Sequence, residues 1–252
     1  MNGITRTMPI LALAGLAAMA FAATAAPMDH DDDDDEDEVE LGEAQVFVEW
    51  NSTDDDFGIQ FFWDGEPWSE MEVSDHRGRT MLSVKAKRNL KRHGLTEGFF
   101  ESAEPPAEEL SMEEFFERFP EGEYEFEGET LDGADLVGTA EFSHTLATPP
   151  TNLSPAAGDV VDSTGFAVSF DPVSEDLDGE EVAIAYYEVI VEKEDDEPIL
   201  QTFKVILRPS VTSVWVPAGF LEADTEYKFE VIAVTDEGNK TITESGAFST
   251  GE

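Results

Sequence analysis

The stretch Leu221-Glu-Ala-Asp-Thr-Glu-Tyr227-Lys-Phe229-Glu-Val231-Ile-Ala233-Val234 decides the fold of the C-terminal part of this chain. Within it, Tyr227, Phe229, Val231 and Ala233 recur at every second position, which is the side-chain period of a β-strand with one buried face. The same period appears in three more short runs, Phe166 to Phe170, Tyr187 to Val191 and Phe203 to Leu207. The pattern predicts several short antiparallel strands and not helices.

A tyrosine opens the decisive strand, and a leucine, Leu221, lies six residues before Tyr227. This arrangement resembles the tyrosine corner of the fibronectin type III family, in which the phenol hydroxyl bonds back to the backbone upstream. The closing run from Ile242 to Thr250 is similar to the last strand of that family. The resemblance covers residues 149–252, and it implies a β-sandwich that presents surfaces for binding.

Two features depart from the family pattern. Phe170 stands where the family usually carries a core tryptophan on its second strand, so an aromatic ring still occupies that place. The loop Asp236-Glu-Gly-Asn-Lys240 contains no Arg-Gly-Asp, so nothing supports integrin binding through that tripeptide.

Residues 40–148 carry strand and turn patterns of their own. Val46, Val48 and Trp50 fall at every second position, and Asp132-Gly133 predicts a hairpin turn. Ser111-Met-Glu-Glu114 is a capping box, which predicts a short helix near 111–119 that ends before Pro120. We expect an immunoglobulin-like β-sandwich with one helical insertion. The predicted fold class is therefore all-β, with tandem β-sandwich domains at 40–148 and 149–252 joined by the stiff segment Thr148-Pro-Pro-Thr151.

The first 39 residues predict export. Residues 1–25 combine one cation, Arg6, an apolar run from Ile10 to Phe21 and small residues at Ala23 and Ala25, which is the pattern of a secretory signal peptide. Residues 26–39 contain the acidic run Asp31 to Glu38 and are predicted to be a disordered spacer. The chain has no Cys and therefore no disulfide framework or lipid-anchor thiol. We expect a soluble periplasmic or extracellular protein after signal cleavage, without membrane insertion.

The charge balance excludes one class of partner. The chain has 14 Lys and Arg against 58 Asp and Glu, which gives a net charge of -44. Such a field repels nucleic acids and anionic membrane surfaces, so no nucleic-acid partner is expected. The acids are spread along the whole chain, which favours a solubility or high-salt explanation over one dedicated acidic site. The sequence also has no Gly-x-Ser-x-Gly elbow, phosphate-binding glycine loop or Cys nucleophile, so it predicts a non-enzymatic protein without catalytic residues.

Calcium is the one candidate cofactor, and the turn Asn51-Ser-Thr-Asp54-Asp55-Asp56 is its predicted site. A turn between two strands can direct several oxygens inward, and oxygen is the ligand that Ca²⁺ prefers. The other interpretation of these residues is a solvated acidic hairpin tip. The four His residues show no metal-ligand spacing, so zinc has no support.

A basic cluster contrasts with the acidic chain. It could bind an anion such as phosphate or an acidic glycan, or it could pair internally with the acidic residues around it. Its members are Arg77, Arg79, Lys85, Lys87, Arg88, Lys91 and Arg92.

The sequence therefore predicts a secreted binding or spacer protein of adhesion or scaffold type, modulated by calcium, with a protein or glycan partner. The alternative is an accessory carbohydrate-binding module of a polysaccharide-degrading system. In that alternative the aromatic residues around Trp63 and Trp68 contact sugar, whereas in the first they fill the core.

Overall fold

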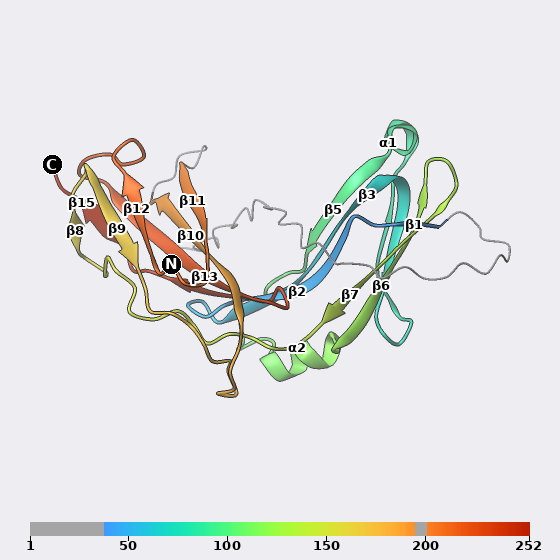
Figure 1. The fold of residues 1–252 in the computed structure, drawn as a ribbon, viewed down its shortest axis with the longest axis horizontal. Helices are drawn as coiled ribbons and strands as arrows, with labels where there is room; N and C mark the ends of the chain where they lie inside the picture. Colours follow the sequence, from blue (N-terminus) through green and yellow to red (C-terminus); the bar gives the residue numbers. More distant parts are fainter. Residues whose placement is uncertain (1–37, 195–200) are drawn as a thin grey trace, which may run out of the picture. The chain divides into compact units, whose positions relative to one another are not determined.

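The computed structural model describes residues 38–194 and 201–252, and residues 36–252 form one compact unit. The predicted signal peptide and most of the predicted spacer lie outside the described residues. The last two positions of the predicted spacer, Glu38 and Val39, belong to a strand. In chain order the elements are β1 (Glu38–Glu40), β2 (Glu43–Asn51), β3 (Asp56–Ser74), β4 (Thr80–Lys85), α1 (Arg88–His93), β5 (Leu95–Glu101), α2 (Met112–Arg118), β6 (Gly122–Thr130), β7 (Asp135–Phe142), β8 (Val160–Val161), β9 (Gly165–Ser169), β10 (Ile184–Lys193), β11 (Thr202–Leu207), β12 (Ser213–Pro217), β13 (Glu226–Thr235), β14 (Lys240–Glu244) and β15 (Phe248–Thr250) (Figure 1).

The elements from β8 to β15 build the C-terminal sandwich. One layer has the order β11-β10-β13-β14, and the other pairs β12 with β9 (Figure 1). The residues at every second position of the predicted strands, including Val168, Val189 and Val231, are buried between the layers. The all-β prediction for this half is confirmed.

The tyrosine corner of the C-terminal sandwich is also confirmed. Tyr227 is fully buried at the start of β13, and its hydroxyl accepts a 2.8 Å hydrogen bond from the backbone N–H of Glu222. Phe170 fills the predicted aromatic position and packs edge-on against Tyr187, with ring centroids 4.8 Å apart. Strand order and corner together give this half the fibronectin type III fold.

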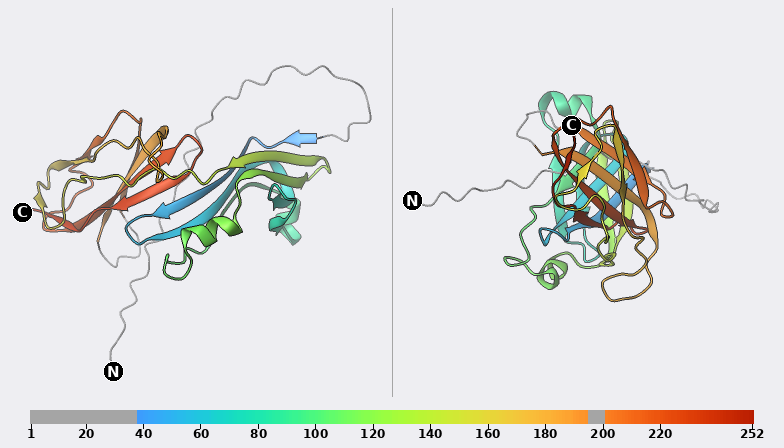
Figure 2. Two further views of the ribbon diagram at one scale, coloured as in Figure 1. Left: turned by 90° about the horizontal axis from the view of Figure 1, so that it is seen from below. Right: turned by 90° about the vertical axis from the view of Figure 1, so that its left-hand side faces the viewer.

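The elements from β1 to β7 build the N-terminal sandwich around the long strand β3. The first half of β3 lies between β2 and β5, and its second half lies between β6 and β4. On one side of β3 the neighbour changes from β2 to β6 between Asp64 and Trp68, and on the other side it changes from β5 to β4 between Trp68 and Glu70. The predicted hairpin at Asp132-Gly133 joins β6 and β7, which lie side by side in Figure 2.

Local signals in the N-terminal sandwich hold as predicted. Helix α2 begins at the Ser111 capping box, in which the Ser111 hydroxyl accepts from the backbone N–H of Glu114 and the Glu114 carboxylate accepts from that of Ser111.

Tyr124 is buried near the start of β6, and its hydroxyl donates to the carbonyl of Pro120 at 3.1 Å. Each sandwich therefore contains a buried tyrosine bonded to backbone four or five residues upstream. Helix α1 was not predicted from the sequence; it lies at the opposite end of this sandwich from α2 (Figure 1).

The two sandwiches share a sheet. Strand β2 of the first pairs in parallel with β14 of the second, so the order β6-β3-β2-β14-β13-β10 runs through both. Their cores remain separate, one containing Trp63 and Phe126 and the other Tyr187 and Phe248. The strand pairing places residues from both sandwiches on one continuous surface.

Candidate functional site

The junction, which we define as the β2–β14 pair and its side-chain bonds, is held first by backbone contacts. Lys240 pairs with Glu49, Thr241 with Trp50 and Ile242 with Asn51. Beyond the end of β2, the backbone N–H of Ser52 donates to the Ile242 carbonyl at 2.9 Å, and the Ser52 hydroxyl donates to the same oxygen at 2.6 Å. These bonds satisfy backbone N–H and C=O groups at the strand edges, which would otherwise need water or another chain as a partner.

Asn239 closes the junction with its side chain. Its oxygen accepts a 3.0 Å hydrogen bond from the backbone N–H of Val48, and its amide nitrogen donates to the carbonyls of Ser143 and Thr145, each at 3.0 Å. Asn239 is buried, so these partners replace water. One residue of the β13–β14 turn thereby bonds both to β2 and to the segment that leaves the N-terminal sandwich.

A buried ion pair crosses the same junction. Lys240 Nζ lies 3.3 Å from Glu49 Oε2, and each side chain is only 8 % exposed. The Lys240 ammonium also lies over the Phe47 ring, 4.7 Å from its centroid. Because burying two charges costs desolvation energy, such a pair fixes register more than it adds stability.

Three carboxylates converge beside this ion pair, and we call Glu49, Glu101 and Glu104 the carboxylate group. One ligand oxygen from each lies within 4.8 Å of the other two. Glu49 comes from β2, Glu101 from the end of β5, and Glu104 from the segment that follows β5. Gly58 makes room for them, since a Cβ on Gly58 would stand 2.9 Å from Glu104 Cγ.

Gln60 contacts the carboxylate group from the strand between β2 and β5. It is 0 % exposed, and its Nε2 donates to Glu101 Oε1 at 3.1 Å. Its Oε1 is buried and has no hydrogen-bond partner among the described residues. A buried amide oxygen without a partner is energetically costly, so this position needs a physical explanation.

The carboxylate group carries more negative charge than its surroundings stabilise. Desolvation, and then the charges of Glu101, Glu49 and Asp56, raise the pKa of Glu104 to about 8. Desolvation is likewise the first cause that raises the pKa of Asp56, to about 6, followed by Asp54 and Glu244. Proximity of this kind favours a shared proton or a bound cation.

The predicted calcium site at Asp54, Asp55 and Asp56 lies next to this group without joining it. Asp54 and Asp55 are exposed in the β2–β3 turn, where the Asn51 side-chain oxygen accepts from the backbone N–H groups of Thr53 and Asp54. Asp56 is half-buried at the start of β3. A metal site at these three residues stays a prediction.

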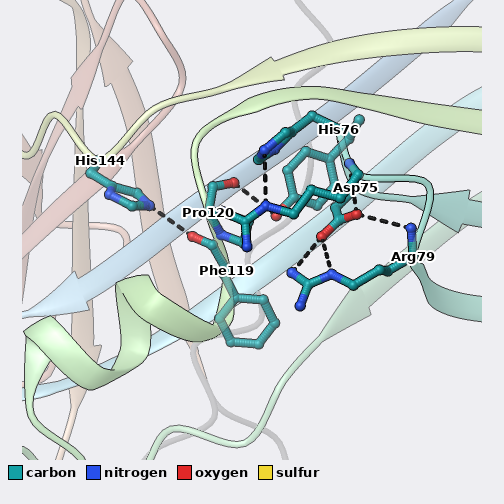
Figure 3. Close-up of polar contacts among 8 residues, drawn as sticks. Asp75, His76, Arg79, Phe119, Pro120 and His144 are labelled. Atoms are coloured by element: carbon teal, nitrogen blue, oxygen red, sulfur yellow. Dashed lines mark hydrogen bonds and ion pairs between the residues drawn. The ribbon is translucent and has the colours of Figure 1, made fainter.

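The predicted basic cluster is divided between two environments. Arg79 pairs with the buried Asp75 in the β3–β4 turn, through Nε at 2.7 Å, and Lys85 pairs with Glu70. Although burial of Asp75 acts in the opposite direction, the bonds from Arg79 and from the Arg77 backbone hold its pKa below the usual range. Figure 3 shows Asp75 facing Arg79, while His144 points to the carbonyl oxygen of Phe119, which lies 2.7 Å from its Nε2.

The remaining cations of the cluster are exposed. Arg77 lies in the β3–β4 turn, whereas the others lie on or beside α1: Lys87, Arg88, Lys91 and Arg92. Internal pairing is therefore seen for Arg79 and Lys85, and anion binding by the cluster stays a prediction.

The aromatic residues proposed for sugar contact lie in the core. Trp63 and Trp68 are 0 % and 1 % exposed, with ring centroids 5.6 Å apart, so their faces cannot meet a ligand. The core interpretation is the correct one. The exposed tryptophan is Trp215 on β12, which is 61 % exposed and was not singled out from the sequence.

The junction residues were also missed by sequence reasoning. Glu49, Gln60, Glu101 and Glu104 come from three separate strands and a loop, so no local spacing joins them. Asn239 appeared only as part of a turn. A signal was present in Gly58 and Gln60, a glycine and a polar residue inside the otherwise apolar run from Phe57 to Trp63, because such positions often mark close approach of another group.

Comparison with known proteins adds fold likeness only. No protein-family model matches the chain, and no curated protein matches it. Among solved structures, the FN1–FN3 domains of chicken CNTN1 are 13 % identical, with 83 % of this chain and 68 % of that chain covered and a TM-score of 0.35. The third fibronectin III domain of human KIAA0343 protein is 23 % identical, with 42 % and 82 % covered and a TM-score of 0.30. The assignment of the C-terminal fold rests on its own strand order and on Tyr227.

Neither described helix has the length and apolar character needed to cross a bilayer.

Proposed function

We propose that this chain is an exported, non-enzymatic binding or scaffold protein whose two sandwiches act as one fixed pair. The observation that carries the proposal is the junction. Strand pairing, the side-chain hydrogen bonds of Asn239 and the Glu49–Lys240 ion pair together restrain the two sandwiches at several points. A scaffold needs such restraint because surfaces on its two halves must meet a partner in a defined geometry.

Two finer parts of the proposal come from the sequence. Export is supported by the signal-peptide pattern of residues 1–25 and by the absence of Cys. Modulation by calcium is supported by the high acidic content and by carboxylates gathered where the sandwiches meet. An acidic surface also keeps an exported protein soluble and monomeric.

Distance measurements between the two halves test the scaffold role. The chain has no native Cys, so spin labels can be attached at Glu117→Cys on α2 and Gly219→Cys after β12, both at exposed positions. Because the junction restrains the halves, we expect one narrow distance distribution by pulsed electron paramagnetic resonance. Asn239→Ala should broaden it, whereas the exposed Asn89→Ala should leave it unchanged. A broad distribution in the parent protein would remove the basis of the scaffold role.

Carbohydrate contact remains a second candidate role, and Trp215 is the observation that favours it. Its ring is exposed, and it lies over Gly165, where a Cβ would stand 2.6 Å from the ring. A supported and exposed indole can stack on a sugar face. Binding to a glycan array that is lost in Trp215→Ala would favour this role, and an array without binding would exclude it.

A further inference from the structure

We propose that Glu49, Glu101 and Glu104, together with the side-chain oxygen of Gln60, form a Ca²⁺-binding site on the shared sheet. This site is distinct from the turn at Asp54, Asp55 and Asp56. The proposal stands on the geometry of these four residues and does not depend on the scaffold role.

The ligand set is made of oxygen atoms that can reach one ion. The three carboxylate oxygens lie within 4.8 Å of one another. Oxygen ligands of Ca²⁺ lie about 2.3–2.6 Å from the ion, so atoms on opposite sides of it are about 4.6–5.2 Å apart. A single Ca²⁺ between the carboxylates therefore needs little movement of the chain. Mg²⁺ is a poorer fit, because its shell is about 4.0–4.2 Å across and it gives up water reluctantly.

Gln60 is the observation that separates this group from an ordinary acidic surface. Its side chain is fully buried and meets the group at Glu101, yet its Oε1 has no partner among the described residues. A half-turn of the amide exchanges Nε2 and Oε1. That turn would direct the oxygen to an ion beside Glu101 in place of the Nε2 hydrogen bond, and the amide nitrogen would take the position where the oxygen now has no partner.

Charge and space also match a divalent cation. When all three carboxylates are ionised, they and the Lys240 ammonium on Glu49 sum to two negative charges, which one Ca²⁺ neutralises. Gly58 pairs with Glu49 across β2 and β3, and its missing side chain leaves the space that Glu104 occupies. Any larger residue would push Glu104 away from the other two carboxylates.

The location gives the ion a specific effect. Glu49 is both a proposed ligand and the partner of Lys240 on β14, so binding at Glu49 acts directly on the pairing of the two sandwiches. Glu101 and Glu104 are exposed, so the ion can enter from solvent. Exposed sites of this type in extracellular proteins bind Ca²⁺ with dissociation constants on the order of 10⁻⁴–10⁻³ M, and we expect that range here.

Calorimetric titration of the full chain with CaCl₂ tests the site. About 0.5 M NaCl in all samples suppresses diffuse attraction to the other carboxylates. We expect saturable binding of one Ca²⁺, a rise in melting temperature, and a smaller effect of MgCl₂ at equal ionic strength. Glu101→Gln/Glu104→Gln should weaken binding by about tenfold or more. The matched control, Glu108→Gln/Glu109→Gln, removes two exposed charges a few residues away and should bind as the parent does.

Two further variants keep the test independent of folding defects. Glu104→Gln relieves repulsion, so it should melt no lower than the parent without Ca²⁺ while losing the rise that Ca²⁺ produces. Gly58→Ala should weaken binding by displacing Glu104 while all carboxylates remain. No saturable binding by the parent, or unchanged binding in Glu101→Gln/Glu104→Gln, overturns the proposal. Binding lost in Asp55→Asn and retained in that double variant would place the ion at the turn instead.

Discussion

The side-chain oxygen of Asn239 accepts a 3.0 Å hydrogen bond from the backbone N–H of Val48, which lies 191 positions earlier in the chain. This bond joins the β13–β14 turn of one sandwich to the middle of β2 in the other. Both groups are buried, so water cannot replace either partner. The relationship makes Asn239 the most informative single position for testing the junction.

Replacing Asn239 should destabilise the whole chain. Asn239→Ala leaves the Val48 N–H and the carbonyls of Ser143 and Thr145 without their partner. A buried group left unpaired costs about 1–3 kcal/mol, so we expect a loss in that range or somewhat above it. Urea unfolding measures it, with Asn89→Ala on the exposed surface of α1 as the matched control. Equal midpoints for the two variants would show that Asn239 does not restrain the sandwiches.

The two tyrosine hydroxyls should contribute separately to stability. Tyr227→Phe removes the acceptor of the Glu222 N–H, and Tyr124→Phe removes the donor to the Pro120 carbonyl. Each ring stays in place, so each variant should lose about 1 kcal/mol. The sites lie in different sandwiches, and the losses should add in the double variant. If all three variants have the same urea midpoint as the parent, the hydrogen bonds assigned to the Tyr227 and Tyr124 hydroxyls do not stabilise the fold.

Glu230 should make the protein less stable as pH rises. Burial, followed by the charges of Glu244, Glu192, Glu49 and Asp54, raises its pKa to about 8. The ordinary pKa of Glu is about 4.3, so the folded state holds a proton that the unfolded state releases between these values. The loss of folding stability that Glu230 causes is therefore absent below about pH 4, grows between about pH 4 and about pH 8, and is complete above about pH 8.

Glu230→Gln removes this pH-dependent cost. We expect the variant to exceed the parent in stability by a few kcal/mol near pH 9 and to match it near pH 4. Glu226→Gln, at an exposed position of the same strand, is the control. Urea unfolding across this pH range measures the difference in stability between Glu230→Gln and the parent. A difference that does not change with pH would rule out titration of Glu230 as its cause.

Export gives a prediction that does not depend on the fold. If residues 1–25 are a signal peptide, the exported protein should begin near Ala26. N-terminal sequencing of protein from the periplasm or medium measures this directly. Recovery of Met1 from that fraction would show that the leader is not removed.

Local structure was predictable because its causes are local. Alternation gave the strands around Val189 and Val231, and Tyr227 gave the corner. The Ser111 capping box gave α2, because a cap and its helix lie within a few residues of each other. Helix α1 was missed because its residues, Arg88–His93, are charged or polar apart from Leu90 and none is buried, so no apolar period marks it.

The junction was not predictable, for a physical reason. Strands β2 and β14 pair through backbone groups, which every residue except proline carries in the same form. Nothing in the side chains of Glu49 or Lys240 identifies the partner strand about 190 positions away. The carboxylate group depends on that arrangement and on the course of the segment at Glu104. With 58 acidic residues in the chain, composition alone could not single out these three.

The shared sheet bears on how this chain can be divided. A cut at the boundary suggested by the sequence, between residues 148 and 149, would uncover one edge of β2 and one edge of β14. Uncovered edges are templates for pairing with other chains, which in a separated half means a second copy of itself. Each sandwich thus acts as the protective cover of the other, and the excised halves should tend to self-associate even though each keeps its own core and most of its charge.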